Sequence, residues 1–343
     1  MAIPLCYKAC SLVLHSPRNG DLFLCNCKYS YSSTKQGQND FKLIRGQKLL
    51  KDLGTWGIGG PCNYFTQVFD HTQLVSAIRY CNEHSLRFLV IGKGSNCLFC
   101  DLGFDGCVIL NRIEFVERRE KEDGVYKVGS GFGFNRLGVQ CSNEGFTGLE
   151  FAGGIPGTVG GAIYMNAGAN GQETADVVES VDFVTIDGRL QRLERPDLNF
   201  VYRSSPFQSM PDLAAIVAVT FWLRSSGTSK TRLQEYLERR KASQPIGERS
   251  AGSVFRNPSD LGVSAAELIE KAGLKGLRVG GAMISKVHSN FFINCGGSTS
   301  QDMLSLIAIA KEKVDTKFGV QLKEEVLYVH PRGKTKTLWR SDS

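Results

Sequence analysis

Two glycine-rich segments contain the residue types that hold a phosphate group. The first, Gly92-Lys93-Gly94-Ser95-Asn96, follows an apolar run. Small residues with free backbone amides can form an anion-binding nest, to which the side chains of Ser95 and Asn96 add donors. Cys97 stands where the dinucleotide fingerprint GxGxxG has its third glycine, and the segment does not match a P-loop. Alone, it predicts only a backbone turn that closely approaches another group.

The second segment begins at Gly153 and holds six glycines up to Gly168. Each glycine costs about 0.5–1 kcal/mol relative to alanine in regular structure, so this density favours a cofactor lying against the backbone. A set of tight turns is the alternative. Together the two segments suggest a dinucleotide spread across two subdomains. The candidate cofactor-binding residues are Gly92, Lys93, Gly94, Ser95, Asn96, Gly153, Gly154, Ile155, Pro156, Gly157, Thr158 and Gly160.

Arg203, which follows Tyr202, and Glu325 are the charged candidates for a reaction centre. A guanidinium stays charged and can hold a carboxylate through two parallel hydrogen bonds. An ordinary surface arginine is the alternative. In the run Leu322–Val329, strand alternation places Glu324 and Glu325 on opposite faces, each with apolar neighbours. Either carboxylate could be half-buried, which would raise its pKa, or could be an exposed charge at a sheet edge.

Ser253 and Lys275 are weaker candidates on local sequence. Ser253 lies between Gly252 and Val254, where a turn or cap is more common than a catalytic role, because serine alone is a poor acid. Lys275 has glycines close by, which keeps it accessible to a phosphate, although a plain surface lysine is as common. Five histidines without paired spacing and a single CxxC predict no metal site.

The elements that must position these residues form two groups. Up to about residue 225 the chain is rich in strands, and beyond a linker at 225–228 helices dominate. The first group has a helix over 72–85, strands over 87–91 and 107–110, and a hairpin with a type I′ turn at Asp187-Gly188. The second has helices over 232–243, 264–273 and 300–319, the last two capped by Ser264 and Ser300, and a strand over 290–294. This pattern predicts an α+β protein.

Composition excludes several classes of function. At 343 residues the chain suits two or three domains, and its formal charge of +7 is not gathered into a basic block, so nucleic-acid binding is not expected. The longest apolar run, Ala214–Leu223, is well short of the roughly 20 residues of a membrane span. An anionic small molecule is the favoured partner. Nothing in the sequence specifies an oligomeric state.

Residues 1–45 differ from the rest of the chain. They carry six basic and two acidic residues, a charge of +4, and include a serine cluster. This composition is typical of an organelle transit peptide, with a plastid favoured over a mitochondrion; a disordered tail is the alternative. The cysteines show no secreted-scaffold spacing, which indicates a reducing compartment.

Six motifs in one order make the sequence similar to a known family. They are Thr55-Trp-Gly-Ile-Gly-Gly60, Gly92–Asn96, Gly148–Gly161, Tyr202-Arg-Ser-Ser205, Gly252-Ser-Val-Phe255 and Glu325-Val326. Over about residues 48–330 the chain resembles the UDP-N-acetylmuramate dehydrogenases (UDP-N-acetylenolpyruvoylglucosamine reductases, the MurB family). The short span between Tyr202 and Gly252 resembles the branch without an extra tyrosine-bearing loop.

The resemblance implies a fold and its cofactors. The expected fold is α+β: a two-part FAD-binding domain of the PCMH, or vanillyl-alcohol-oxidase, type and a C-terminal α+β substrate domain. The expected subdomains are residues 46–115 and 116–225, followed by a substrate domain at 226–320. Residues 321–343 return a strand to the active site and form the tail. FAD is the expected cofactor and NADPH the hydride source.

The resemblance also implies a reaction. Hydride addition to an enolpyruvyl ether of a UDP-sugar builds negative charge on the substrate carboxylate, and a proton must reach the α carbon. Arg203 would pair with the carboxylate, Ser253 would relay the proton, and Glu325 would assist protonation. Tyr202 and Lys275 would contact the UDP-sugar. Other interpretations are an FAD-dependent oxidase of a hydroxylated small molecule and a non-catalytic flavin-binding relic.

Overall fold

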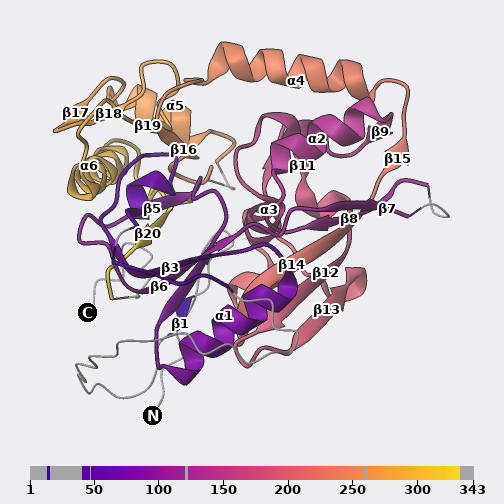
Figure 1. Ribbon diagram of the computed structural model, residues 1–343. Helices are drawn as coiled ribbons and strands as arrows, with labels where there is room; N and C mark the ends of the chain where they lie inside the picture. Colours follow the sequence, from indigo (N-terminus) through magenta and orange to yellow (C-terminus); the bar gives the residue numbers. More distant parts are fainter. Residues whose placement is uncertain (1–13, 16–40, 47, 120–122, 259–260, 333–343) are drawn as a thin grey trace.

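A computed structural model describes residues 14–15, 41–46, 48–119, 123–258 and 261–332 (Figure 1). Most of the predicted transit peptide lies outside these ranges. Within them, no helix combines the length and the apolar character that a bilayer span requires.

The first sheet has a parallel centre of β4 (Phe88–Ile91), β6 (Phe104–Asn111) and β3 (Cys62–Val68). Two short antiparallel strands, β1 (Leu14–His15) and β2 (Ile44–Arg45), form its edges. Helix α1 (His71–Glu83) begins at its cap Asp70 and buries an apolar stripe. That stripe, the sheet and strand β14 (Leu213–Trp222) share one core, so the predicted helix and strands of this region are confirmed.

The second sheet is antiparallel, in the order β13-β12-β14-β8-β7. Its strands are β7 (Val116–Arg118), β8 (Val125–Gly129), β12 (Val178–Thr185), β13 (Leu190–Glu194) and β14 (Leu213–Trp222). The predicted hairpin is present, but its type I′ turn is wrong. Only Gly188 has a positive φ, of 81°, and its N–H donates to the Thr185 carbonyl at 2.8 Å. A type I turn closed by a left-handed glycine fits this pattern.

The C-terminal sheet has the order β16-β19-β18-β17. Its strands are β16 (Ser250–Ser253), β17 (Arg278–Val279), β18 (Ala282–Ile284) and β19 (Phe291–Asn294), packed with α5 (Ala265–Lys271) and α6 (Ser300–Phe318). Ser264 caps α5 as predicted. The predicted cap of α6 is wrong: Thr299 caps it in a capping box with Asp302, while the Ser300 hydroxyl donates to Asp101 Oδ2 at 2.8 Å.

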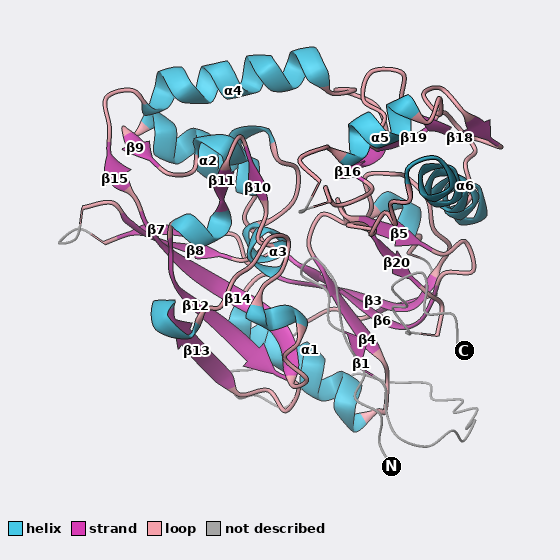
Figure 2. Cartoon of the chain, turned by 180° about the vertical axis from the view of Figure 1, so that it is seen from behind, coloured by secondary structure: helices cyan, strands magenta, loops and turns pink. Residues whose placement is uncertain are grey.

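Helix α4 (Ser229–Ser243) spans the gap between the second sheet's side of the molecule and the C-terminal sheet (Figures 1 and 2). It packs on α2 (Phe134–Asn143) and the 3-10 helix η2 (Glu150–Gly154), although the sequence placed it in the substrate domain. The domain boundaries themselves stay a prediction. The remaining elements are α3 (Val159–Met165), β5 (Cys97–Phe99), β9 (Phe146–Thr147), β10 (Gly168–Ala169), β11 (Gln172–Glu173), β15 (Arg224–Ser225), β20 (Leu327–Val329), η1 (Leu50–Asp52), η3 (Thr174–Asp176), η4 (Arg195–Asp197) and η5 (Pro206–Gln208).

Two connections join the C-terminal unit to the N-terminal half. The buried Trp56 indole donates to the Phe292 carbonyl at 2.7 Å, and Asn294 Nδ2 donates to the Trp56 carbonyl at 2.8 Å. Strand β20 pairs in parallel with β5, directly after the Gly92–Asn96 loop. These contacts bring the early and late segments of the chain side by side.

Candidate active site

One pocket is lined by loops and helices of the N-terminal half together with strands β16 and β19 of the C-terminal sheet. Its walls include the Gly92–Asn96 loop, the Ile155–Thr158 turn, Arg203, Ser253 and Glu325, and it holds about 970 Å³, open solvent included. Residues separated by more than half the chain are thus brought to one place, as the motif order predicted. Its charged lining residues are Lys93, Arg203, Arg240 and Glu325, three cations against one carboxylate, so the pocket suits an anionic ligand.

The two glycine segments lie against each other at the pocket wall. A Cβ on Gly92 would lie 2.4 Å from Thr158 Oγ1, and one on Gly157 would lie 2.8 Å from Ser95 Oγ. The Ser95 hydroxyl donates to the Pro156 carbonyl at 3.2 Å, which ties the segments together. A side chain at either glycine would collide with the Thr158 or Ser95 side chain and push the two segments apart. The segments therefore form a close cradle of main-chain groups, suited to a phosphate-bearing cofactor.

Not every glycine in the second segment serves this cradle. A Cβ on Gly153 would meet Leu233, and one on Gly154 would meet the Arg240 side chain, each at 2.4 Å, and both partners lie on α4. Gly153, Gly154 and Gly160 are absent from the pocket lining. For the first two, close packing of α4 supplies the physical reason for glycine in place of the predicted cofactor contact.

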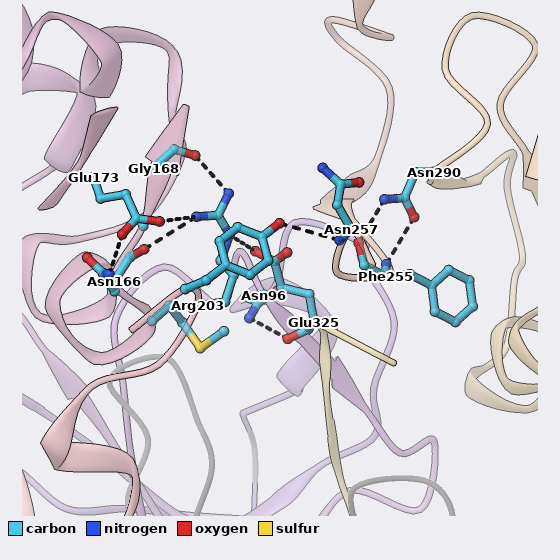
Figure 3. A network of polar contacts seen from close by, with 12 residues as sticks. Asn96, Asn166, Gly168, Glu173, Arg203, Phe255, Asn257, Asn290 and Glu325 are labelled. Carbon is cyan, nitrogen blue, oxygen red and sulfur yellow. Dashed lines mark hydrogen bonds and ion pairs between the residues drawn. The ribbon is translucent and has the colours of Figure 1, made fainter. Parts of the chain in front are cut away.

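Arg203 is held rigidly at the pocket wall. Its φ of 54° is unusual for a residue with a side chain. The guanidinium donates through Nη2 to the Gly168 carbonyl at 2.9 Å and through Nη1 to the Asn166 carbonyl at 3.4 Å. Its Nε lies 3.0 Å from Glu325 Oε1 (Figure 3). The backbone and these contacts together fix the cation in place.

Glu325 is the carboxylate that reaches the pocket. Its N–H donates to the Val254 carbonyl at 2.8 Å, and its carbonyl accepts from Asn96 Nδ2 at 3.0 Å. Burial raises the pKa of the Glu325 carboxyl, although Arg203 and Arg256 act in the opposite direction. A larger fraction of this carboxyl is therefore protonated near neutrality than of an ordinary glutamate.

Glu324 turns away from the pocket. Its carboxylate accepts from Lys311 Nζ of α6 at 2.7 Å. The predicted strand over Leu322–Val329 is shorter than expected: only β20, from Leu327, is regular, and a bend at Val326 breaks the alternation. Strand alternation did not decide which of the two carboxylates faces the pocket. The contact with α6 draws Glu324 away and leaves Glu325 at the pocket.

Ser253 ends β16 and lines the pocket beside Gly252, whose φ is 75°. The turn behind it is locked by Asn290, whose side chain accepts from the Phe255 N–H at 2.9 Å and donates to the Phe255 carbonyl at 2.8 Å (Figure 3). Val254 links the serine's strand to Glu325 through the hydrogen bond given above. Ser253 thus sits in a firmly braced turn, next to the segment that carries the carboxylate.

Tyr202 and Lys275, predicted to contact the substrate, are not in the pocket lining. The Tyr202 ring lies against the Arg203 guanidinium, with its centroid 4.9 Å away, and its hydroxyl accepts from the Asn257 N–H at 3.4 Å. Lys275 forms an ion pair with Glu270 at 2.9 Å. Tyr202 therefore adjoins the site, while Lys275 is engaged outside the pocket lining.

Within the described ranges, no group of three potential ligands that could hold a metal ion is present. Cys97 and Cys100 are both buried and free, and burial raises the pKa of the Cys97 thiol to about 12. Such a thiol is a poor nucleophile at neutral pH. The CxxC is therefore structural in character.

Sequence reasoning missed Arg240 and Gln244, which bring the end of α4 into the pocket, and Phe291 of β19. It also missed Asn166, whose φ of 46° and hydrogen bond to Glu173 at 2.8 Å shape the loop that holds Arg203. The signal for Asn166 was present in the sequence, since it stands among glycines where left-handed turns are common.

The glycine cradle and the reaction centre beside it define a class of protein: an FAD-dependent oxidoreductase. An FAD-binding domain model matches residues 63–194, and the model of the UDP-N-acetylenolpyruvoylglucosamine reductase C-terminal domain matches residues 244–329. The chain belongs to the UDP-N-acetylenolpyruvoylglucosamine reductase (MurB) family, which uses FAD and NADPH in peptidoglycan precursor synthesis.

Several relatives support this assignment across most of the chain. The reductase of Protochlamydia amoebophila is 49% identical over 281 residues, covering 82% of this chain and 92% of that protein. The reductase of Chlamydia trachomatis serovar D is 44% identical over 277 residues, covering 81% and 93%. The crystal structure of the Thermus caldophilus reductase covers 84% of this chain and 98% of its own, at 34% identity and a TM-score of 0.70.

Proposed function

We propose that this protein reduces UDP-N-acetylglucosamine-enolpyruvate to UDP-N-acetylmuramate with NADPH, through FAD. The observation that carries the proposal is the convergence of Arg203, Ser253 and Glu325 on the pocket that also holds the glycine cradle. An FAD-dependent oxidase would have no need for a fixed cation beside a buried carboxyl. The family relatives named above are reductases of this type.

The cradle residues fit FAD. The Gly92–Asn96 loop and the Gly157-Thr158 turn lie so close together that a Cβ at Gly92 would collide with the Thr158 side chain. Main-chain amides there would hold the diphosphate, and Lys93 adds positive charge at the same wall. When bound, FAD supplies the hydride that the reduction needs.

Arg203 binds and orients the substrate carboxylate in this proposal. Negative charge develops on that carboxylate during the reaction, and a fixed guanidinium stabilises it without having to reorganise. Because two backbone carbonyls already hold Nη1 and Nη2, the cation stays in place whether or not substrate is bound. Tyr202, which packs on the guanidinium, restricts its movement further and adjoins the substrate.

Ser253 donates the proton to the α carbon, and Glu325 supports it. Burial raises the pKa of Glu325 and so increases the protonated fraction of its carboxyl, which favours assistance of protonation over repulsion of the substrate carboxylate. Lys275 would have to break its ion pair with Glu270 to reach the diphosphate of the sugar nucleotide. We propose that, on substrate binding, Lys275 exchanges Glu270 for the diphosphate.

Turnover by the purified protein tests the proposal. Beyond the single equivalent that reduces its FAD, the yellow holoenzyme should oxidise NADPH only when the enolpyruvyl sugar nucleotide is present, with one UDP-N-acetylmuramate formed per NADPH in turnover. Omitting the sugar nucleotide is the control for oxidase activity. Rapid NADPH oxidation that consumes oxygen and ignores the sugar nucleotide would instead support the oxidase.

We also propose that residues 1–45 direct the protein to a plastid and that the chain belongs to the branch without the extra tyrosine loop. The leader's +4 charge and serine cluster support the first point, and the short span from Tyr202 to Gly252 the second. A fusion of residues 1–45 to a fluorescent protein should accumulate in plastids of plant cells. Diffuse fluorescence, or accumulation in mitochondria, would contradict this targeting.

A further inference from the structure

The C-terminal end of α4 presents two polar side chains to the pocket wall. Arg240 and the helix cap Gln244 lie one turn apart, and both line the pocket that contains Ser253. The stem of Arg240 packs on Gly154, where a Cβ would come within 2.4 Å of its Cδ. Helix packing thus holds the guanidinium at the wall.

Within the part of the chain that the structure describes, no hydrogen-bond or ion-pair partner is found for the Arg240 guanidinium, and Gln244 Oε1 is buried without a donor. Arg203 in the same pocket, by contrast, has Glu325 and two carbonyls. Arg240 is partly buried, which lowers the pKa of its guanidinium, yet an arginine remains charged. A buried amide oxygen such as Gln244 Oε1 is costly unless a ligand donates to it, and the charged guanidinium beside it is open to the same ligand.

The two groups specify the chemistry of that ligand. Arg240 requires an acceptor, whereas Gln244 Oε1 requires a donor. A phosphate offers only acceptors, so it would leave Gln244 unsatisfied. A cyclic imide, with a carbonyl oxygen beside an N–H, satisfies both. The isoalloxazine ring of FAD and the uracil of a UDP-sugar each have such an edge.

We propose that Arg240 and Gln244 bind the imide edge of the FAD ring, with Arg240 donating to a carbonyl oxygen and Gln244 accepting from the imide N–H. FAD is favoured over uracil because the cradle takes the cofactor's diphosphate and the ring must reach Ser253, which ends β16, the strand that follows Gln244 closely in the chain. This inference rests on FAD as the cofactor and not on the proposed sugar substrate.

The charge of Arg240 has a second consequence. Reduction adds negative charge to the ring, and a cation at the carbonyl edge stabilises the reduced form more than the oxidised form. Arg240 therefore raises the midpoint potential of the bound cofactor. A residue that only packed α4 against Gly154 would leave this potential unchanged.

Arg240→Gln in the full chain tests both consequences, with Arg239→Gln, its exposed neighbour on the same helix, as the matched control. We expect Arg240→Gln to weaken FAD binding to the apoprotein by about tenfold or more, since a charge-assisted hydrogen bond is lost. Its midpoint potential should fall below that of the wild type. Arg239→Gln should match the wild type in both, and Arg240→Lys should recover part of the potential.

The substitution Gln244→Glu also tests the pair. It creates no cavity, and the charge that it adds to the end of α4 has a partner. The new carboxylate, one turn from Arg240, should form an ion pair with it, so the apoprotein keeps its thermal stability while FAD affinity and potential both fall. Unchanged FAD affinity and potential in both variants would overturn the proposal. Weaker FAD binding with an unchanged potential would place Arg240 at the diphosphate and overturn it also. Loss of UDP-sugar binding alone, read from the spectrum of bound FAD, would assign the pair to uracil.

Discussion

At the scale of single residues, Arg203 combines a left-handed backbone with a guanidinium fixed by two carbonyls and Glu325. Arg203→Lys keeps the charge but loses the planar fork. We expect the reoxidation of reduced enzyme by the enolpyruvyl substrate to slow by about 100-fold, the scale seen when one donor to a developing oxyanion is removed. FAD affinity should not change. Rapid-mixing absorbance of the flavin measures the rate; an undiminished rate would contradict the role of Arg203.

Glu325→Gln probes the raised pKa of this carboxyl. Because its pKa in the folded protein lies above the unfolded value, Glu325 destabilises the native state when the pH exceeds the folded pKa, and the penalty disappears below the unfolded value of about 4.3. The glutamine variant should therefore melt at a higher temperature than the wild type at pH 8. The difference should shrink toward pH 4, while reoxidation by substrate is slowed at neutral pH.

Thermal unfolding across this pH range makes the comparison, with Glu324→Gln as the control because Glu324 contacts Lys311 outside the pocket. That control should be less stable than the wild type at pH 8, since it weakens a largely buried ion pair. Equal melting temperatures of Glu325→Gln and wild type at every pH would contradict the assigned environment of Glu325.

Sequence motifs named three candidate residues that the structure brings to one pocket, whereas the surroundings of these residues were not predictable. Arg203, Ser253 and Glu325 meet as expected, and the choice of Glu325 over Glu324 is explained by Lys311, which lies on a helix that no local pattern could pair with it. Arg240 escaped notice because it stands in a strongly charged helix, where an arginine is ordinarily solvated. Its burial depends on how α4 docks, which local sequence does not encode.

At the scale of elements, the glycines of the cradle and the glycines packed against α4 have different roles, and single substitutions distinguish the two roles. Gly92→Ala would place a methyl group 2.4 Å from Thr158 Oγ1 in the cradle, so we expect FAD binding to weaken by about tenfold or more. Gly153→Ala meets only the flexible end of Leu233 on α4. It should lower stability by about 1–3 kcal/mol through overpacking and leave FAD affinity near the wild-type value.

Flavin fluorescence titration and urea unfolding of the two variants measure these effects. If Gly153→Ala weakened FAD binding as much as Gly92→Ala, the division between cradle and packing glycines would be incorrect. The helices α1, α4 and α6 were predictable because each is long, and α1 and α6 carry apolar residues at helical spacing. The turn at Gly188 and the cap at Thr299 were not, since neighbouring residues of similar propensity compete for the same position.

At the scale of the whole molecule, Trp56 in the N-terminal half binds the C-terminal unit through hydrogen bonds. Trp56→Phe removes the buried indole hydrogen bond to the Phe292 carbonyl. We expect a loss of about 2 kcal/mol in the free energy of unfolding, because that carbonyl loses a buried partner. Trp222→Phe, at a site 54% exposed, is the control and should change stability little. Equal urea midpoints for the two variants would show that this connection contributes nothing.

The ordered motifs anticipated the arrangement of this molecule around one site, but they did not reveal that α4 belongs to the FAD-binding side by its packing. Long-range contacts such as that of Trp56 with Phe292 join residues more than 200 positions apart, and no local pattern specifies such a pairing. The individual strands and helices were therefore easier to predict than the way in which they enclose the pocket.

The two half-reactions of Ser253→Ala test the central claim most directly. Under anaerobic conditions NADPH should reduce the bound FAD of wild type and variant at similar rates. UDP-N-acetylglucosamine-enolpyruvate should then reoxidise the wild type rapidly and the variant about 1,000-fold more slowly, because the proton donor is missing. An artificial electron acceptor should reoxidise both equally. Unimpaired reoxidation of Ser253→Ala by the sugar nucleotide would contradict the account.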